Sequence, residues 1–292
     1  MNNNVILIQE SQSKLAETIA EHFNPSQKTI LQFTLYDKLF ISRKYTKNIV
    51  FPRIPYIEYI DFPKAYSLVS KVCVTNDVAQ NILNQNHIDS LKLDFIVSYN
   101  QNKIKLNRVF DNYYKFGAIL NFNQDIHIIE DLVCVFYEAA RFRNTILVLA
   151  IESTEEQKVL DFIENLHKKI GIAPSSTKVI LSISGNITDD YRISVINSID
   201  CLLQINAVFI SDIEYYYALQ SHKRIIGKYN LDKRYNIETI STNKRIFKFQ
   251  KCNNFYDHID HDSLLKKLSC IDKATNIHYT MSTKLDLGSL YE

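Results

Sequence analysis

The sequence predicts an α/β fold in which two parallel sheets, one in each half of the chain, face a cleft. Short apolar runs rich in isoleucine, leucine and valine alternate with amphipathic stretches of helical length, which is the pattern of βαβ units. Several of these runs are apolar throughout, as strands covered on both faces are. A polar segment, 99–108, separates an earlier set of such units from a later set and reads as a linker.

The elements of the first half follow from these runs and from their stop signals. Strands are expected at 5–8, 29–35, 48–51, 72–75 and 93–98, and helices at 14–23, 64–70 and 77–86. Asn24 and Pro25 end the first helix. Three prolines between residues 52 and 63 predict an irregular, surface-lining loop with several aromatic side chains.

The second half repeats the alternation with longer helices. Strands are expected at 116–120, 146–151, 178–183, 201–205, 224–226 and 246–249, and helices at 129–142, 154–170, 213–221 and 262–268, with one more ending near residue 200. Crossovers of this kind are right-handed and give a parallel sheet.

A glycine turn in the second half marks a candidate ligand site. Gly185 closes an apolar run directly before a helix that Asn186 or Thr188 can cap. In open α/β sheets such a turn holds phosphate or a nucleobase, since the backbone approaches closely and free N–H groups point outward. A tight turn that needs a positive φ explains the glycine equally well.

Four segments carry a family resemblance. GNITDDYRISVINSID (185–200), YALQSHKRIIG (217–227), VCVTNDVAQNILNQNHIDSLKLDFIVSYN (72–100) and YKFGAILN (114–121) follow one another in the chain as similar segments do in one family. That family is the group 1 retaining glycosyltransferases of the GT-B fold. The second segment occupies the place of its E-A-M-A-x-G-x-P-V-I-G motif, and the fourth resembles the first strand of its donor domain. Together the segments cover about two thirds of the chain.

The resemblance implies two Rossmann-like domains with a reduced N-terminal one. Residues 1–106 would form the acceptor-side domain, 107–274 the donor domain and 275–292 a C-terminal tail. The donor would be a nucleotide-diphosphate sugar, with no metal and no other cofactor. Its implied binding residues are Gly185, Asn186, Ser211, Glu214, Tyr217 and Asn121. Because the first half is short and lacks a glycine-rich opening turn, it is either truncated or relies on another chain for the acceptor site.

The departures from the family concern charge. Its two donor-binding glutamates fall on Phe209 and Tyr217, and Glu214, one helical turn before Tyr217, is expected to stand in for a ribose contact. The family's arginine and lysine after the first donor-domain strand map onto Asn121 and the 124–125 region. A neutral amide and a carboxylate do not supply the positive charge that a departing diphosphate needs.

Composition excludes several classes of protein. With 46% hydrophobic and 23% charged residues, the 292-residue chain is globular rather than disordered. A net charge of +2 gives no sign of nucleic-acid binding. No apolar run reaches the length of a membrane span and the N-terminus does not resemble a signal peptide, so a cytoplasmic location is expected, with peripheral membrane contact left open.

Other side chains give weaker signals. Five cysteines lie far apart without a C-x-x-C pair and are expected to be reduced, three of them inside apolar runs. His258 and His261 can bind metal, but a third ligand at a telling spacing is lacking, and the segment precedes a helix in which Asp262 can act as an N-terminal acidic residue. The three tyrosines at 215–217 suit either stacking on a nucleobase or packing against neighbours.

Two hypotheses of function follow. The first is a glycosyltransferase that takes a sugar from a nucleotide-diphosphate sugar held by Gly185, Ser211 and Glu214, and passes it to an unidentified glycan, lipid or protein acceptor. The second is a catalytically inactive GT-B-like protein that serves as partner or substrate-binding subunit of an active transferase. The lost charge favours the second, and the order of elements fits both.

Overall fold

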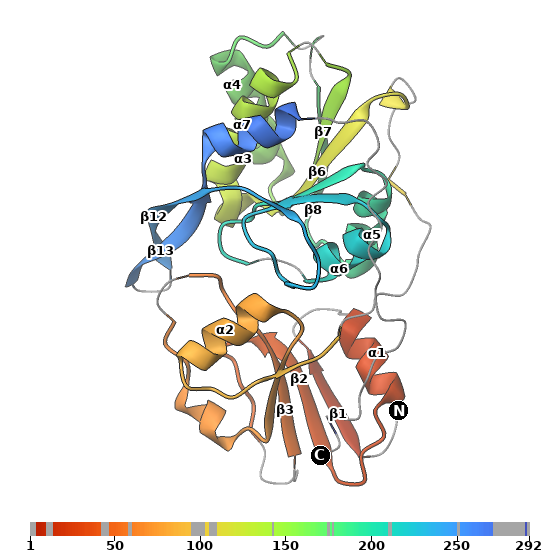
Figure 1. Ribbon diagram of the computed structural model, residues 1–292, viewed down its shortest axis with the longest axis vertical. Coiled ribbons are helices and arrows are strands. Elements are labelled where there is room, and N and C mark those ends of the chain that lie inside the picture. Colours follow the sequence, from red (N-terminus) through yellow and green to blue (C-terminus); the bar gives the residue numbers. More distant parts are fainter. Residues whose placement is uncertain are drawn as a thin grey trace.

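The computed structural model describes residues 4–9, 14–41, 47–57, 60–94, 103–104, 110–141, 143–173, 176, 178–209, 212–249, 252–270 and 290. Two α/β domains, each built on a parallel sheet, lie one above the other in Figure 1. The predicted fold class is thereby confirmed. The expected boundary at residues 106 and 107 lies outside the described residues.

The N-terminal domain is a five-stranded parallel sheet whose strands follow chain order. The strands are β1 (Val5–Gln9), β2 (Thr29–Leu35), β3 (Lys47–Arg53), β4 (Lys71–Val74) and β5 (Leu91–Lys92), with α1 (Lys14–His22), the 3-10 helix η1 (Lys64–Leu68) and α2 (Asp77–Gln85) between them. Leu290, near the chain end, packs into the core of this domain. A sheet in chain order has no point at which the order reverses, so it lacks the ligand crevice of doubly wound sheets.

The C-terminal domain has six parallel strands in the order β11-β10-β9-β6-β7-β8. They are β6 (Tyr114–Asn121), β7 (Thr145–Glu152), β8 (Val179–Ser184), β9 (Cys201–Gln204), β10 (Arg224–Gly227) and β11 (Glu238–Thr239). The helices are α3 (Phe122–Ala139), α4 (Glu156–Lys169), α5 (Asp189–Asn197), α6 (Asp212–Gln220) and α7 (His261–Ser269). This is the Rossmann strand order, and the order reverses between β6 and β9.

Among the helices, α3 differs most from the bounds that the sequence predicted. It begins at Phe122, seven residues before the expected start. The side chain of Asn121 caps it by accepting a hydrogen bond of 3.2 Å from the Gln124 amide, and Asp125 in the first turn is buried. The polar residues between the expected strand and the expected helix are therefore the helix cap and its first turn.

Three further elements differ from expectation. Strand β12 (Thr242–Phe249) pairs with β13 (Cys252–Ile259) as an antiparallel hairpin, of which only 246–249 was predicted as strand. The segment 64–70 forms the short η1 rather than a full helix. Tyr56 and Ile57, expected in a surface-lining loop, are 6% and 8% exposed because they pack in the interior.

Cysteines lie mostly in the interior. Cys73 and Cys201 are buried, Cys134 is half-buried and Cys270 is exposed, and all four are free thiols. Burial raises the pKa of the Cys73 thiol to about 12, so this side chain behaves as a small apolar residue.

Candidate functional site

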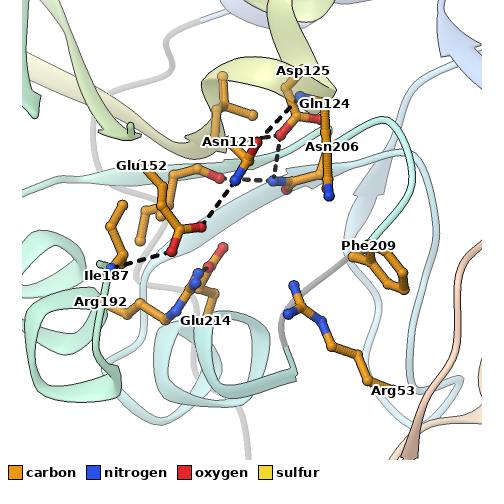
Figure 2. Close-up of a pocket in the computed structure, with 12 residues that line it drawn as sticks. Arg53, Asn121, Gln124, Asp125, Glu152, Ile187, Arg192, Asn206, Phe209 and Glu214 are labelled. Atoms are coloured by element: carbon orange, nitrogen blue, oxygen red, sulfur yellow. Dashed lines mark hydrogen bonds and ion pairs between the residues drawn. The ribbon is translucent and has the colours of Figure 1, made fainter. Parts of the chain in front are cut away.

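A small hollow, open in part to solvent, lies where the strand order of the C-terminal sheet reverses. It is lined by Arg53, Ile119, Leu120, Asn121, Gln124, Asp125, Glu152, Ile187, Arg192, Asn206, Phe209 and Glu214. Asn121 and Glu152 end strands β6 and β7, and Asn206 follows β9. Arg53 comes from the other domain, at the end of β3 (Figure 2). The hollow thus occupies the crevice in which doubly wound sheets bind ligands.

On the side of the hollow formed by α3, a carboxylate of the protein accepts hydrogen bonds from backbone amides. Asp125 accepts hydrogen bonds from the Asn121 amide, at 2.8 Å, and from the Ala207 amide, at 2.6 Å. Burial raises the pKa of Asp125 even though these hydrogen bonds favour its charged form. The Asn121 and Ala207 amides are therefore already partnered by a carboxylate of the protein.

Glu152 likewise accepts a hydrogen bond from a backbone amide just before the start of α5. Its carboxylate accepts from Asn121 Nδ2 at 3.2 Å and from the Ile187 amide at 3.4 Å. Ile187 belongs to the turn that follows Gly185. A carboxylate of the protein thus lies where the resemblance implies the donor's phosphates.

Arg192 of α5 and Glu214 of α6 form a buried ion pair beside these residues. The Arg192 side chain is 15% exposed and that of Glu214 is 2% exposed. Burial raises the pKa of Glu214 to about 7, against the opposing effect of the Arg192 and Arg53 guanidinium groups. Near pH 7 the protonated and ionised forms of this carboxyl are therefore both populated.

Arg53 supplies a positive charge from the N-terminal domain. Its guanidinium carbon lies 4.8 Å from the centre of the Phe209 ring, in a cation–π contact across the two domains. Figure 2 shows Arg53 facing the hollow, with Arg192 and Glu214 on the far side. Phe209 is the residue onto which the family's first donor glutamate maps.

The predicted site residues separate into two groups. Glu214 and Asn121 line the hollow. Tyr217 is fully buried and its hydroxyl donates to Asn197 Oδ1 at 3.0 Å. Gly185 and Asn186 are exposed and do not line the hollow, and Ser211 lies outside the described residues.

The structure corrects one sequence interpretation and decides between the alternatives of two others. The turn at Gly185 does not require a positive φ, because among the described glycines only Gly171 has one. Thr188 rather than Asn186 caps α5, since Thr188 Oγ1 accepts from the Tyr191 amide at 3.3 Å. Tyr215, Tyr216 and Tyr217 are all core residues, which settles their role in favour of packing.

Sequence reasoning missed Arg53, Arg192, Glu152 and Asn206. Glu152 ends a buried parallel strand, and this position alone marks it as a site candidate, because such strand ends border the crevice. Arg53 and Arg192 carry no local signal, since they lie far apart in the sequence and meet only through the arrangement of the two domains.

The charge of the hollow is the property most relevant to function. Among its described lining residues, two arginines (Arg53 and Arg192) face three carboxyl groups (Asp125, Glu152 and Glu214). With all three ionised, the lining carries one net negative charge. Such a surface repels a diphosphate rather than stabilising one.

The two histidines considered as metal ligands lie elsewhere. Nε2 of His258 is 2.9 Å and Nε2 of His261 is 3.0 Å from the two oxygens of Asp131. The neighbouring histidines lower the pKa of Asp131 against the opposing effect of burial. Across the described ranges, no group of three or more His, Cys, Asp or Glu side chains is placed to hold a metal ion.

No protein-family model matches the sequence, and no curated protein matches it. Among solved structures, TarM matches with a TM-score of 0.51 and 12% identity, over 83% of this chain and 47% of the TarM chain. A Staphylococcus aureus TarM mutant in complex with Fondaparinux, alpha-GlcNAc-glycerol and UDP matches with a TM-score of 0.51 and 12% identity, over 82% of this chain and 48% of that chain. The chain spans about half the length of these structures.

A third solved structure covers more of the chain. It is Methanocaldococcus jannaschii UDP-GlcNAc 2-epimerase in complex with UDP-GlcNAc and UDP, with a TM-score of 0.47 and 11% identity over 94% of this chain and 70% of that chain. In the part of the chain that the structure describes, no helix has both the length and the apolar character to cross a membrane. Strand order and the likeness to TarM together show a GT-B-like fold of two Rossmann-like domains.

Proposed function

We propose that the chain is a GT-B-like protein that binds a sugar-containing ligand in the hollow but does not transfer the sugar, acting as partner or binding subunit of an active transferase. Its location supports ligand binding, because the hollow lies at the switch point of a Rossmann sheet. Its lining supports a sugar, because amide and carboxyl groups such as Asn121, Asn206 and Glu152 hydrogen-bond hydroxyl groups, and Phe209 adds an apolar ring face.

The ion pair between Arg192 and Glu214 is the observation that carries the proposal. Transfer from a nucleotide-diphosphate sugar requires positive charge at the departing diphosphate. Arg192, on the C-terminal-domain side of the hollow, is neutralised by Glu214. Asp125 and Glu152 add further negative charge. Binding without transfer is what this balance of charges favours.

Sugar transfer is the second candidate function, and the two arginines favour it. Arg53 and Arg192 approach the hollow from opposite domains, as groups that clamp a diphosphate would. Protonation of Glu214, whose pKa is about 7, removes one negative charge and frees Arg192 for an anion. The two candidate functions therefore differ in whether the hollow binds and stabilises a diphosphate.

Calorimetric titration and a turnover assay distinguish the two. A panel of nucleoside diphosphates, their sugars and the corresponding methyl glycosides is titrated at pH 8, and release of nucleoside diphosphate from each nucleotide sugar is followed. We expect glycosides to bind at least as tightly as the nucleotide sugars, without turnover. If none of the glycosides binds, the proposed ligand class is wrong. Steady release of nucleoside diphosphate from a nucleotide sugar would instead establish sugar transfer, the second candidate function.

The affinity for a diphosphate should depend on pH through Glu214. Below pH 7 this carboxyl is mostly protonated, so the net charge of the lining changes from one negative charge toward zero as the pH falls from 8 to 6. We expect UDP-GlcNAc to bind about five- to tenfold more tightly at pH 6 than at pH 8. Calorimetry at both pH values measures the ratio.

Glu214→Gln is the matched control for this pH dependence. It keeps the size of the side chain but removes the titrating group, so its affinity for UDP-GlcNAc should vary little between pH 6 and 8. An equal pH dependence in both proteins would assign the effect to another group.

A further inference from the structure

The two domains share one hydrophobic core cluster. Its N-terminal members come from η1, β4, α2 and the loops after β2 and β3, and its C-terminal members include residues of α5, α6, β7, β9 and β10. The buried members that represent the two sides best are Tyr56, Val74 and Leu83 in the first domain and Tyr216, Ile213 and Leu231 in the second. Interfaces between domains that move are small and polar, whereas a shared apolar core resists opening because it would be exposed to water.

Helix α6 places a carboxylate against the first domain at the edge of this core. Asp212, its first residue, accepts hydrogen bonds from Thr75 Oγ1 and, at 2.8 Å, from Asn76 Nδ2. Asn76 is itself held in place, because its Oδ1 caps α2 by accepting from the Ala79 amide at 2.8 Å. The N-termini of α2 and α6 are thereby joined through two side chains.

Tyr216, one turn further along α6, strengthens the same contact. Its hydroxyl donates to the carbonyl oxygen of Thr75 and lies 3.3 Å from Asp232 Oδ2. The ring is 1% exposed. Thr75 is therefore held through its backbone and its side chain by one helix of the other domain.

A second group of contacts surrounds the start of α2. The Asp77 amide donates to the Leu231 carbonyl oxygen at 2.8 Å, and the Asp77 carboxylate accepts from the Lys233 amide at 2.8 Å. Lys92 lies 2.6 Å from Asp77 and 3.4 Å from Asp232. Since Asp232 is also near Tyr216, the two groups of contacts form one network.

We infer that helix α6 and the loop 229–235 lock the two domains into one unit, so that the domains do not open and close relative to one another. The shared core supplies the apolar contact area, and the network around Asp212, Asp77 and Asp232 fixes the relative orientation of the domains. The inference concerns the domain arrangement alone and holds whichever ligand the hollow binds.

Hydrogen exchange of backbone amides tests the lock in the unmodified protein. The amides of Tyr56 and Asp77 donate across the domains, to Val208 and Leu231, both at 2.8 Å. In a locked unit they exchange only when the protein unfolds, as slowly as the Leu149 amide in the centre of β7. Exchange of Tyr56 and Asp77 at nearly unprotected rates, with Leu149 still protected, would show that the domains open and would overturn the inference.

A pair of variants tests the role of α6. Tyr216→Phe removes a hydroxyl that bonds across the domains, whereas Tyr137→Phe removes one that lies 3.2 Å from His167 Nε2 within the C-terminal domain. We expect Tyr216→Phe to speed exchange of the Tyr56 and Asp77 amides roughly tenfold relative to Leu149. Tyr137→Phe should leave that ratio unchanged, and an equal response of both variants would refute a special role for α6.

Discussion

Replacing Arg192 by alanine should cost about 1–2 kcal/mol more unfolding free energy at pH 8 than at pH 5, because the buried Glu214 carboxyl loses its cation and then has to take up a proton to stay buried. The Glu214 side chain is 2% exposed, so water replaces little of the lost interaction. Chemical denaturation measures the difference. Lys168→Ala is the control, because it breaks an exposed pair with Glu164, which contributes about 1 kcal/mol or less.

The loss of stability in Arg192→Ala should depend on pH. Burial holds the pKa of Glu214 near 7 in the folded protein, above the ordinary 4.5 of a glutamate side chain. The folded state therefore binds this proton more strongly than the unfolded state does, and the free energy of unfolding falls as the pH rises from about 4.5 to about 7. Without Arg192 the folded pKa rises further. The variant should then lie closer to the parent at pH 5 and be about 1–2 kcal/mol less stable than the parent at pH 8.

A second change in the same variant separates the loss of the cation from the loss of packing. In Arg192→Ala with Glu214→Leu the uncompensated carboxylate is gone, and stability at pH 8 should largely return, because buried ion pairs are often replaceable by apolar groups. A double variant as unstable as Arg192→Ala would show that Arg192 stabilises the protein mainly through its own packing.

Gly117→Ala should destabilise the protein by about 1–3 kcal/mol, as overpacking of a core does. A Cβ atom at Gly117, in the centre of β6, would lie 2.6 Å from both Cδ1 and Cγ2 of Ile199. Ile199 is 1% exposed and has little room to move. Thermal or chemical unfolding measures the effect.

Gly185→Ala is the matched control for this substitution. Its nearest neighbour would be Thr154 Cγ2 at 3.8 Å, an ordinary contact, and the backbone at Gly185 is not in the positive-φ region. We expect a change within about 0.5 kcal/mol. A large loss at Gly185 would mean that the turn demands glycine after all.

The sequence by itself determined the elements and the fold class. The strand at 29–35 was predicted with the bounds that the structure gives to β2, because a short run rich in β-branched and apolar residues is a local property. Helix caps were less certain: Asn121 was expected to end a strand and to bind the donor, and its role as the cap of α3 was not predicted, since the same polar residues favour turns and caps alike.

The site was predicted only in part. Glu214 lines the hollow as expected, but Tyr217, three residues on, points to Asn197 and the core. Three residues advance a helix by about 4.5 Å along its axis. Because the hollow borders only the first turn of α6, that distance separates a lining residue from a buried one.

Only the tertiary structure decided the charge of the hollow. Arg53 and Glu152 belong to different sheets, and Arg192 meets Glu214 because α5 and α6 pack side by side. Sequence spacing does not report such contacts, which depend on strand order and on the orientation of the two domains. The sequence alone thus predicted the order of strands and helices and the absence of the family's donor-binding charges. Only the fold brings two arginines and three carboxyl groups together around one crevice.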